Sequence, residues 1–266
     1  MTNRALLMKQ IKNRIYSLRF KAESIIRARF QMGTARIVNF RITYTDVLSL
    51  YVEYKDIFCR LIYHFESEKP KPLIIDGGGC IGMSVLYFKS VYPEARIICF
   101  EPDAEIFKIL QHNLTTNGLN DVTLINAGLA KDEGVLSFSS DNVDGGKIVP
   151  NSQGNMKIQT VRLSTYISDT IDFLKLNIEG QELAVLQEVE ESGKLQNIKE
   201  MVIEYHGWPD ESQKLGELLT ILDRNGFRYL IHDFDWETCS ASKPPFRLNP
   251  QVTWFCLIYA RKQDVS

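Results

Sequence analysis

The sequence predicts an α/β fold: a mostly parallel sheet with helices on both faces, an antiparallel last strand and a helical extension at the N-terminus. From residue 73 onward, short apolar runs alternate with segments of helical periodicity, which is typical of parallel sheets. A glycine-rich turn follows the first apolar run. The last two runs have no helix between them, so the final strand should run antiparallel.

The N-terminal part differs in charge from the rest. The whole chain of 266 residues carries a net charge of -2, yet residues 1–41 hold ten Lys and Arg and a single acid, Glu23. Such an arm can contact an anionic partner, a membrane surface or the chain's own acidic body. We expect a helical cap with a solvated basic face, which could also join two copies in a homodimer.

The extension is expected to span residues 1–70, before a main domain over 71–266. Residues 3–30 should form a helix because Leu7, Ile11, Ile15 and Leu18 recur at a spacing of three or four. The remaining elements of the extension are a short strand or hairpin over 36–43, a helix over 46–65 and a charged linker with two prolines over 66–72.

In the main domain, seven apolar runs are expected to form the sheet: residues 73–76, 95–101, 122–126, 171–177, 198–205, 227–232 and 252–260. The expected helices cover 81–91, a segment from Pro102-Asp103 to Asn117-Gly118, 181–190 and 211–225. Two further runs, 134–139 and 157–162, should pair as a hairpin. The composition, with 44% hydrophobic residues, allows the large core that this fold needs.

Cysteine usage and hydropathy indicate a compartment. The five cysteines form no CxxC pair and no zinc motif, which favours free thiols in a reducing environment over a disulfide framework. No run approaches the roughly 18 apolar residues of a membrane-spanning helix, and charged residues interrupt the N-terminus where a signal peptide would be apolar. We therefore expect a cytoplasmic location.

The glycine-rich turn and the acid after it indicate an adenosine-containing ligand. Gly77, Gly79 and Gly82 fit G-x-G-x-x-G between a strand and a helix. Glu101 ends the next strand, 19 residues beyond Gly82. A carboxylate at this position can accept hydrogen bonds from both ribose hydroxyls. Asp76 directly precedes the glycines; it would repel a pyrophosphate but attract the cationic S-adenosylmethionine. A nicotinamide-dependent oxidoreductase is the alternative.

Four blocks in this order, residues 76–82, 100–102, 113–119 and 173–182, resemble the FkbM family of S-adenosylmethionine-dependent methyltransferases. The resemblance runs from about Leu73 to Leu230. It implies a Rossmann-like class I methyltransferase fold with a seven-stranded sheet. It also implies S-adenosylmethionine as cofactor, S-adenosylhomocysteine as product, and O-methylation of a hydroxyl on a sugar, glycan or polyketide-type product.

The resemblance also implies roles for particular residues. The cofactor-binding set would be Asp76, Gly78 and Gly82 at the methionine end with Gly77 in the same loop, Glu101 at the ribose, Pro102, Asp103, Asn126 and Ala127 around the adenine, and Asn177 near the transferred methyl group. Two positions depart from the family pattern: Cys80 replaces a common Asn, and Asn177 replaces the usual Asp. An amide cannot act as a general base, so a catalytically weak cofactor-binding module is a further alternative.

A polar cluster is expected at two neighbouring strand ends. Lys175, Asn177 and Glu179 alternate with apolar residues, as do Glu204 and His206 on the next strand. His206 is the candidate base because its ordinary pKa is about 6.5, with Glu204 or Glu179 orienting it. Lys175 is expected to form an ion pair with one of these glutamates. A divalent metal on Asn177, Glu179, Glu204 and His206 is chemically plausible but not expected.

The acceptor is expected to be a small molecule or a glycan with a free hydroxyl, and no nucleic-acid partner is expected. Trp208, Trp236 and the loop over 142–146 are candidates for contact with it. Core packing, or a surface turn, would explain the same residues equally well.

Overall fold

The computed structural model describes residues 3–140, 146–149, 154–208, 211–232 and 254–263, with the backbone alone for residues 3–12. Within these residues, seven strands form the main sheet in the order β12-β13-β11-β10-β3-β4-β5. The strands are β3 (Leu73–Gly77), β4 (Arg96–Phe100), β5 (Val122–Ile125), β10 (Phe173–Leu176), β11 (Glu200–Gly207), β12 (Phe227–His232) and β13 (Trp254–Lys262).

Strand direction confirms the predicted topology. β13 lies between β11 and β12 and pairs antiparallel with both, while the other neighbours in the sheet pair parallel. After β3 the chain builds the sheet outward through β4 and β5, then returns to the other side of β3 with β10. The carboxyl ends of β3 and β10 therefore form the switch point at which ligands bind in such sheets.

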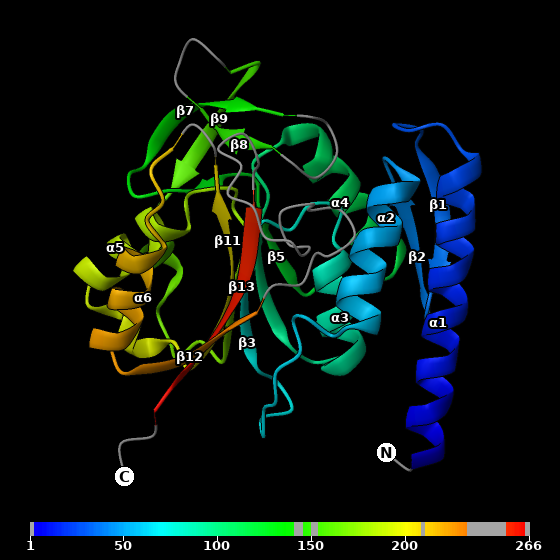
Figure 1. Ribbon diagram of the computed structural model, residues 1–266, viewed down its shortest axis with the longest axis horizontal. Coiled ribbons are helices and arrows are strands. Elements are labelled where there is room, and N and C mark those ends of the chain that lie inside the picture. Colours follow the sequence, from blue (N-terminus) through cyan, green and yellow to red (C-terminus); the bar gives the residue numbers. More distant parts are fainter. Residues whose placement is uncertain (1–2, 141–145, 150–153, 209–210, 233–253, 264–266) are drawn as a thin grey trace, which may run out of the picture.

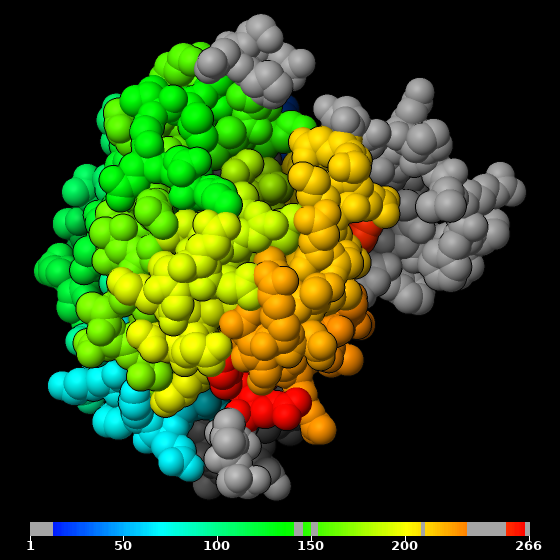
Figure 2. Space-filling model, turned by 90° about the vertical axis from the view of Figure 1, so that its left-hand side faces the viewer, coloured from blue at the N-terminus to red at the C-terminus, as the bar shows by residue number. Residues whose placement is uncertain are grey.

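Helices cover both faces of the sheet, as predicted (Figure 1). α3 (Met83–Val91) and α4 (Ala104–Thr116) share one hydrophobic cluster with one face. α5 (Glu182–Glu191) and α6 (Leu215–Arg224) pack on the other and dominate the yellow and orange surface in Figure 2. α4 begins as expected, because the Asp103 carboxylate caps the backbone N–H groups of Glu105 and Ile106.

A smaller sheet is inserted between β5 and β10. Its strands are β6 (Gly128–Leu129), β7 (Gly134–Ser139), β8 (Lys147–Ile148) and β9 (Met156–Val161), in the order β6-β9-β7-β8. β7 and β9 pair antiparallel, which confirms the predicted hairpin. The short strands β6 and β8 were not predicted. Two 3₁₀ turns, η2 (Leu163–Tyr166) and η3 (Lys194–Asn197), border α5.

The N-terminal part contains α1 (Asn3–Ile26), a hairpin of β1 (Gly33–Ile37) and β2 (Phe40–Tyr44), α2 (Val47–Glu53) and a π-helical segment, η1 (Tyr54–Cys59). The predicted helix over 46–65 therefore ends six residues early. The reason lies at Leu61, whose φ of 61° is left-handed and incompatible with a continuing helix. The predicted helix over 3–30 likewise ends at Ile26.

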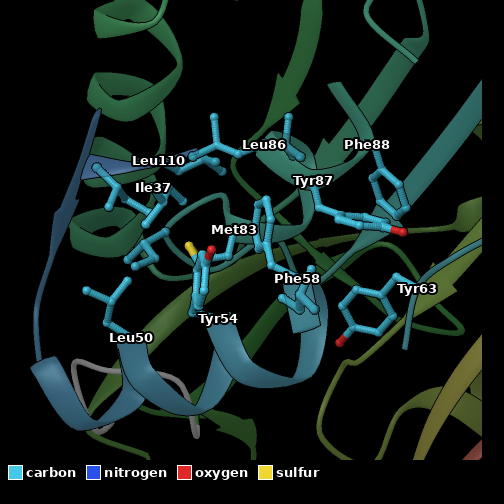
Figure 3. Packing of buried hydrophobic residues seen from close by; sticks show 14 of the residues in the cluster. Ile37, Leu50, Tyr54, Phe58, Tyr63, Met83, Leu86, Tyr87, Phe88 and Leu110 are labelled. Atoms are coloured by element: carbon cyan, nitrogen blue, oxygen red, sulfur yellow. The ribbon is translucent and has the colours of Figure 1, made fainter. Parts of the chain in front are cut away.

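Aromatic side chains join this N-terminal part to the main sheet (Figure 3). Tyr54 stacks on Phe58 at 5.1 Å, and Phe58 meets Tyr87 of α3 edge-on at 5.5 Å. Phe65 stacks on Phe173 of β10 at 4.4 Å. These contacts belong to one continuous cluster of buried residues, so the N-terminal part supplies core to the α3 face. None of the described helices combines the length and apolarity needed to cross a membrane.

Candidate active site

The loop between β3 and α3 requires glycine for steric reasons. Gly78 has a φ of +81°, and a Cβ there would lie 1.9 Å from the carbonyl oxygen of Asn177. A Cβ on Gly79 would lie 2.2 Å from the Cys99 sulfur. Both distances are far inside van der Waals contact. The loop is therefore held closely between β4 and the end of β10.

Lys175 of β10 binds the backbone of this loop. In the parallel pairing of β10 with β3 it lies opposite Asp76; the Lys175 Nζ is 3.0 Å from the Asp76 carboxylate. The same Nζ donates to the carbonyl of Gly77 at 3.2 Å and to that of Gly78. Burial lowers the pKa of Lys175, but Asp76 outweighs burial and the pKa is raised. The predicted glutamate partner of Lys175 is wrong. Its ion-pair partner is Asp76, because β10 pairs directly with β3.

Asp76 lies behind the loop, fully buried. Besides Lys175, its carboxylate accepts a hydrogen bond from the Ser84 hydroxyl at 2.5 Å. Asp76 already has a buried ion-pair partner in Lys175, and its expected attraction to a cationic ligand stays a prediction.

Glu101 lies at the end of β4 and faces the pocket. One carboxylate oxygen accepts a hydrogen bond from the backbone N–H of Cys80 at 2.9 Å, and the other accepts one from the backbone N–H of Asp103 at 2.9 Å. Burial raises the pKa of Glu101 to about 7, although both backbone donors oppose the shift. Each carboxylate oxygen keeps a lone pair for a further donor. Glu101 can therefore still accept hydrogen bonds from the hydroxyl groups of a ligand.

A pocket lies over the carboxyl ends of β3, β4 and β10, and its empty space of about 930 Å³ includes open solvent. Eight of the predicted site residues line it: Gly78, Glu101, Pro102, Asp103, Ala127, Lys175, Asn177 and Glu179. Six lie outside its lining: Asp76, Gly77, Gly82, Asn126, Glu204 and His206. Asn126, for example, donates from its amide to the carbonyls of Glu101 and Pro102 and so supports the pocket wall.

Two walls of the pocket come from segments that the sequence reasoning missed. Glu53, Ile57 and Tyr63 reach it from the N-terminal part, and Phe138 and Ser140, among others, from the small sheet. The segment 46–65 was expected to be a helix, and its sequence carried no signal for a ligand. The Ser140 hydroxyl donates to the Asp103 carboxylate that caps α4, which ties the small sheet to the main domain.

The predicted polar cluster forms between β10 and β11, with a changed geometry. The alternation of side chains stops at Leu176, where β10 ends, and Glu179 adopts a left-handed φ of 53°. His206 nevertheless lies between two carboxylates: its Nε2 is 3.5 Å from Glu179 and its Nδ1 is 3.7 Å from Glu182. Glu182 also accepts the backbone N–H groups of Ile178 and Gly180.

These carboxylates determine the charge of His206. Burial lowers the pKa of His206, but the carboxylates of Glu182, Glu179 and Glu204 outweigh it and raise the pKa to about 9. The imidazole is therefore protonated at neutral pH and has no free lone pair for a proton. The expectation that His206 is the base rested on an ordinary pKa; the carboxylates raise that pKa, and the catalytic role of His206 stays a prediction.

The other members of the cluster are turned to different partners. Glu204 accepts a hydrogen bond from the Tyr63 hydroxyl at 3.2 Å, and burial raises the pKa of Glu204. In the part of the chain that the structure describes, no three His, Cys, Asp or Glu residues form a group that could hold a metal ion. Asn177 is different: its amide oxygen is buried and has no hydrogen-bond partner among the described residues.

Trp208 follows β11 and stacks on His206, with ring centroids 5.7 Å apart, while the Lys147 ammonium lies 3.9 Å from the centre of the Trp208 ring. Gly146, from the loop predicted to face the acceptor, lines the pocket. Trp236 and residues 142–145 lie outside the described residues.

The sheet, with an antiparallel strand between β11 and β12, and the pocket at the switch point define a Rossmann-like class I methyltransferase fold. Residues 76–229, more than half of the chain, match the family model of the methyltransferase FkbM domain. The chain belongs to the FkbM methyltransferase family. Family membership decides for a methyltransferase over the nicotinamide-dependent oxidoreductase that the glycine loop also allowed.

Individual relatives agree with this assignment. The chain is 26% identical to the methyltransferase sdnD of Sordaria araneosa, over 79% of this chain and 89% of that protein. It is 26% identical to the 2-O-methyltransferase NoeI of Sinorhizobium fredii, over 45% of this chain and 58% of that protein. The crystal structure of the methyltransferase FkbM of Methylobacillus flagellatus KT shares the fold with a TM-score of 0.50 and 18% identity, covering 80% of this chain and about half, 54%, of that chain.

Proposed function

We propose that this methyltransferase transfers the methyl group of S-adenosylmethionine to a hydroxyl oxygen of a sugar, glycan or polyketide-type product. One observation carries the proposal: the pocket at the switch point combines a buried carboxylate, Glu101, with an unpartnered buried amide oxygen, that of Asn177. Buried polar atoms without a partner are rare in folded proteins, so the Asn177 oxygen is suited to a hydrogen-bond donor on a ligand. The name of the relative NoeI supports O-methylation.

The residues present fit the cofactor. Glu101 would accept the ribose hydroxyls, and the wall that includes Pro102, Asp103 and Ala127 would hold the adenine. The close backbone of Gly78 and the Asn177 oxygen would meet the methionine end. When bound, S-adenosylmethionine supplies an electrophilic methyl group on a sulfonium. The N-terminal part, residues 1–70, then acts as a cap through Glu53, Ile57 and Tyr63.

Glu179 is the proposed base. It lines the pocket beside Asn177, whereas His206 lies behind it. The cationic His206, 3.5 Å from Glu179, keeps the carboxylate ionised and fixes its direction. Glu179 would hold the acceptor hydroxyl by a hydrogen bond and take up its proton during methyl transfer. His206 is therefore a positioning residue, and Asn177 orients groups without exchanging a proton.

The test separates cofactor binding from turnover. Calorimetric titration of the full chain with S-adenosylhomocysteine should show binding, and Glu179→Gln should retain it while lowering methyl transfer roughly 10²- to 10⁴-fold. His206→Gln should lower turnover less and shift its pH optimum upward, because Glu179 loses a neighbouring cation and its pKa rises. Glu191→Gln, on the exposed part of α5, is the matched control and should leave both measurements unchanged.

Two results would contradict the proposal. Folded protein that does not bind S-adenosylhomocysteine excludes the cofactor. Binding without turnover on any hydroxyl acceptor, with activity gained in Asn177→Asp, would support the alternative of a catalytically weak cofactor-binding module.

A further inference from the structure

Helix α1 carries apolar residues on two opposite faces, and the structure accounts for only one of them. The inner face packs against α2 and η1. There Phe20 is fully buried and meets Tyr54 edge-on at 5.4 Å. The Asn13 amide donates to the carbonyl of Phe58 at 2.7 Å. These contacts anchor α1 and fix which side of the helix faces outward.

The outer face is apolar and exposed. Ile15, Leu18, Ile25 and Ile26 have 61%, 68%, 78% and 84% of their surface accessible. Their spacing places them within an arc of about 100° on the helix. Two residues that follow the helix, Phe30 and Met32, are each 65% exposed. We call the four helical residues, Ile15, Leu18, Ile25 and Ile26, the outer stripe. α1 forms the right-hand edge of the molecule in Figure 1, with the remaining elements on its inner side.

Basic side chains border the outer stripe. Exposed Arg14 and Lys21 lie along one edge and exposed Arg19 along the other. The single acid of residues 1–41, Glu23, is on the inner side of Arg19 and pairs with it at 2.8 Å. The outward surface of α1 therefore combines large aliphatic side chains with an excess of positive charge.

This combination selects among the possible occupants. A second copy of α1 on the outer stripe would bring two such basic borders together, and like charges in close apposition are unfavourable. An anionic bilayer satisfies both features at once: its acyl region takes up the aliphatic side chains, and its headgroups attract the basic borders. We propose that the outer stripe binds α1 to the surface of an anionic phospholipid bilayer.

Sedimentation with lipid vesicles tests the proposal on the full chain. The protein should bind vesicles of phosphatidylcholine with phosphatidylserine and bind pure phosphatidylcholine vesicles weakly or not at all. Leu18→Glu/Ile25→Glu should lower the partition coefficient at least about tenfold, because two aliphatic contacts are lost. Arg14→Gln/Lys21→Gln should lower it about fivefold per charge removed. Raising the salt concentration should weaken binding of the wild type in the same direction.

Matched controls keep the test decisive. Leu230→Glu, at an equally exposed leucine of β12 (66%), should leave vesicle binding unchanged. All variants should bind S-adenosylhomocysteine like the wild type, since none lies in the pocket. Equal binding to both kinds of vesicle, no binding to either, or an equal loss in Leu230→Glu would overturn the proposal. So would a dimer in light scattering that Leu18→Glu/Ile25→Glu converts to a monomer, because the outer stripe would then join two copies.

Discussion

At the scale of single residues, the charge of a side chain depends on neighbours that the linear sequence does not reveal. Glu101 and His206 were both predicted as site residues from their positions at strand ends. Burial raises the pKa of Glu101 to about 7, whereas neighbouring carboxylates raise the pKa of His206 to about 9 against the effect of burial. These shifts change the chemistry that each residue can perform.

The raised pKa of Glu101 predicts a pH-dependent cofactor affinity. Below pH 7 the buried carboxyl is largely protonated, while ribose hydroxyls donate best to the ionised form. Affinity for S-adenosylhomocysteine should therefore rise with pH, by up to about tenfold per pH unit below pH 7, and level off above it. Calorimetry from about pH 5.5 to about pH 8.5 measures this slope. Glu101→Gln should bind weakly and without the slope; a flat profile for the wild type would refute the assigned role.

The buried pair of Lys175 and Asp76 predicts a large effect on stability. Lys175→Met leaves the Asp76 carboxylate buried without its partner, which should lower the free energy of unfolding by about 3–5 kcal/mol. Urea unfolding measures this change in free energy as a shift of the midpoint, with the slope of free energy against urea concentration unchanged. Asp76→Asn/Lys175→Met should recover part of it. Lys71→Met, which removes an exposed pair with Glu94, is the control and should leave the midpoint unchanged.

At the scale of elements, the sequence predicts the regular parts well. Apolar runs bounded by helical periodicity located all seven strands of the main sheet, and Asp103 marked the start of α4 as its cap. Because side chains alternate along a strand, Glu204 and His206 were also expected on one side of β11. The alternation failed where regular dihedral angles end: Glu179 has a left-handed backbone, and no pattern of side chains predicts its direction there.

Contacts between distant elements could not be predicted in the same way. Lys175 was expected to pair with Glu179 or Glu204, because both glutamates were placed at the same pair of neighbouring strand ends. Its partner, Asp76, is 99 positions away and becomes adjacent only through the pairing of β10 with β3. Tyr63, which follows the left-handed residue Leu61, likewise lines the pocket beside residues far from it in the sequence. Such placements depend on the assembled core.

At the scale of the whole molecule, the N-terminal part and the sheet share one core. Residues 1–70 were predicted as an extension and 71–266 as the main domain, and that division stays a prediction. The buried cluster on the α3 face includes Tyr54, Phe58 and Tyr63 together with Phe88 and Phe173. An element that fills the core in this way also fixes the pocket wall. Removing it should therefore abolish both folding and ligand binding.

Deletion of residues 1–65 tests this directly. The shortened chain would expose the aromatic face of α3 and β10, so we expect no cooperative thermal transition, strong binding of a hydrophobic dye and no binding of S-adenosylhomocysteine. In the full chain, Phe58→Ala should lower the free energy of unfolding by about 3–5 kcal/mol. Ile15→Ala, on the exposed face of α1, is the matched control and should leave it unchanged. A shortened chain that unfolds cooperatively and binds the ligand would show that 71–266 folds alone, because its core would then be complete without the N-terminal aromatics.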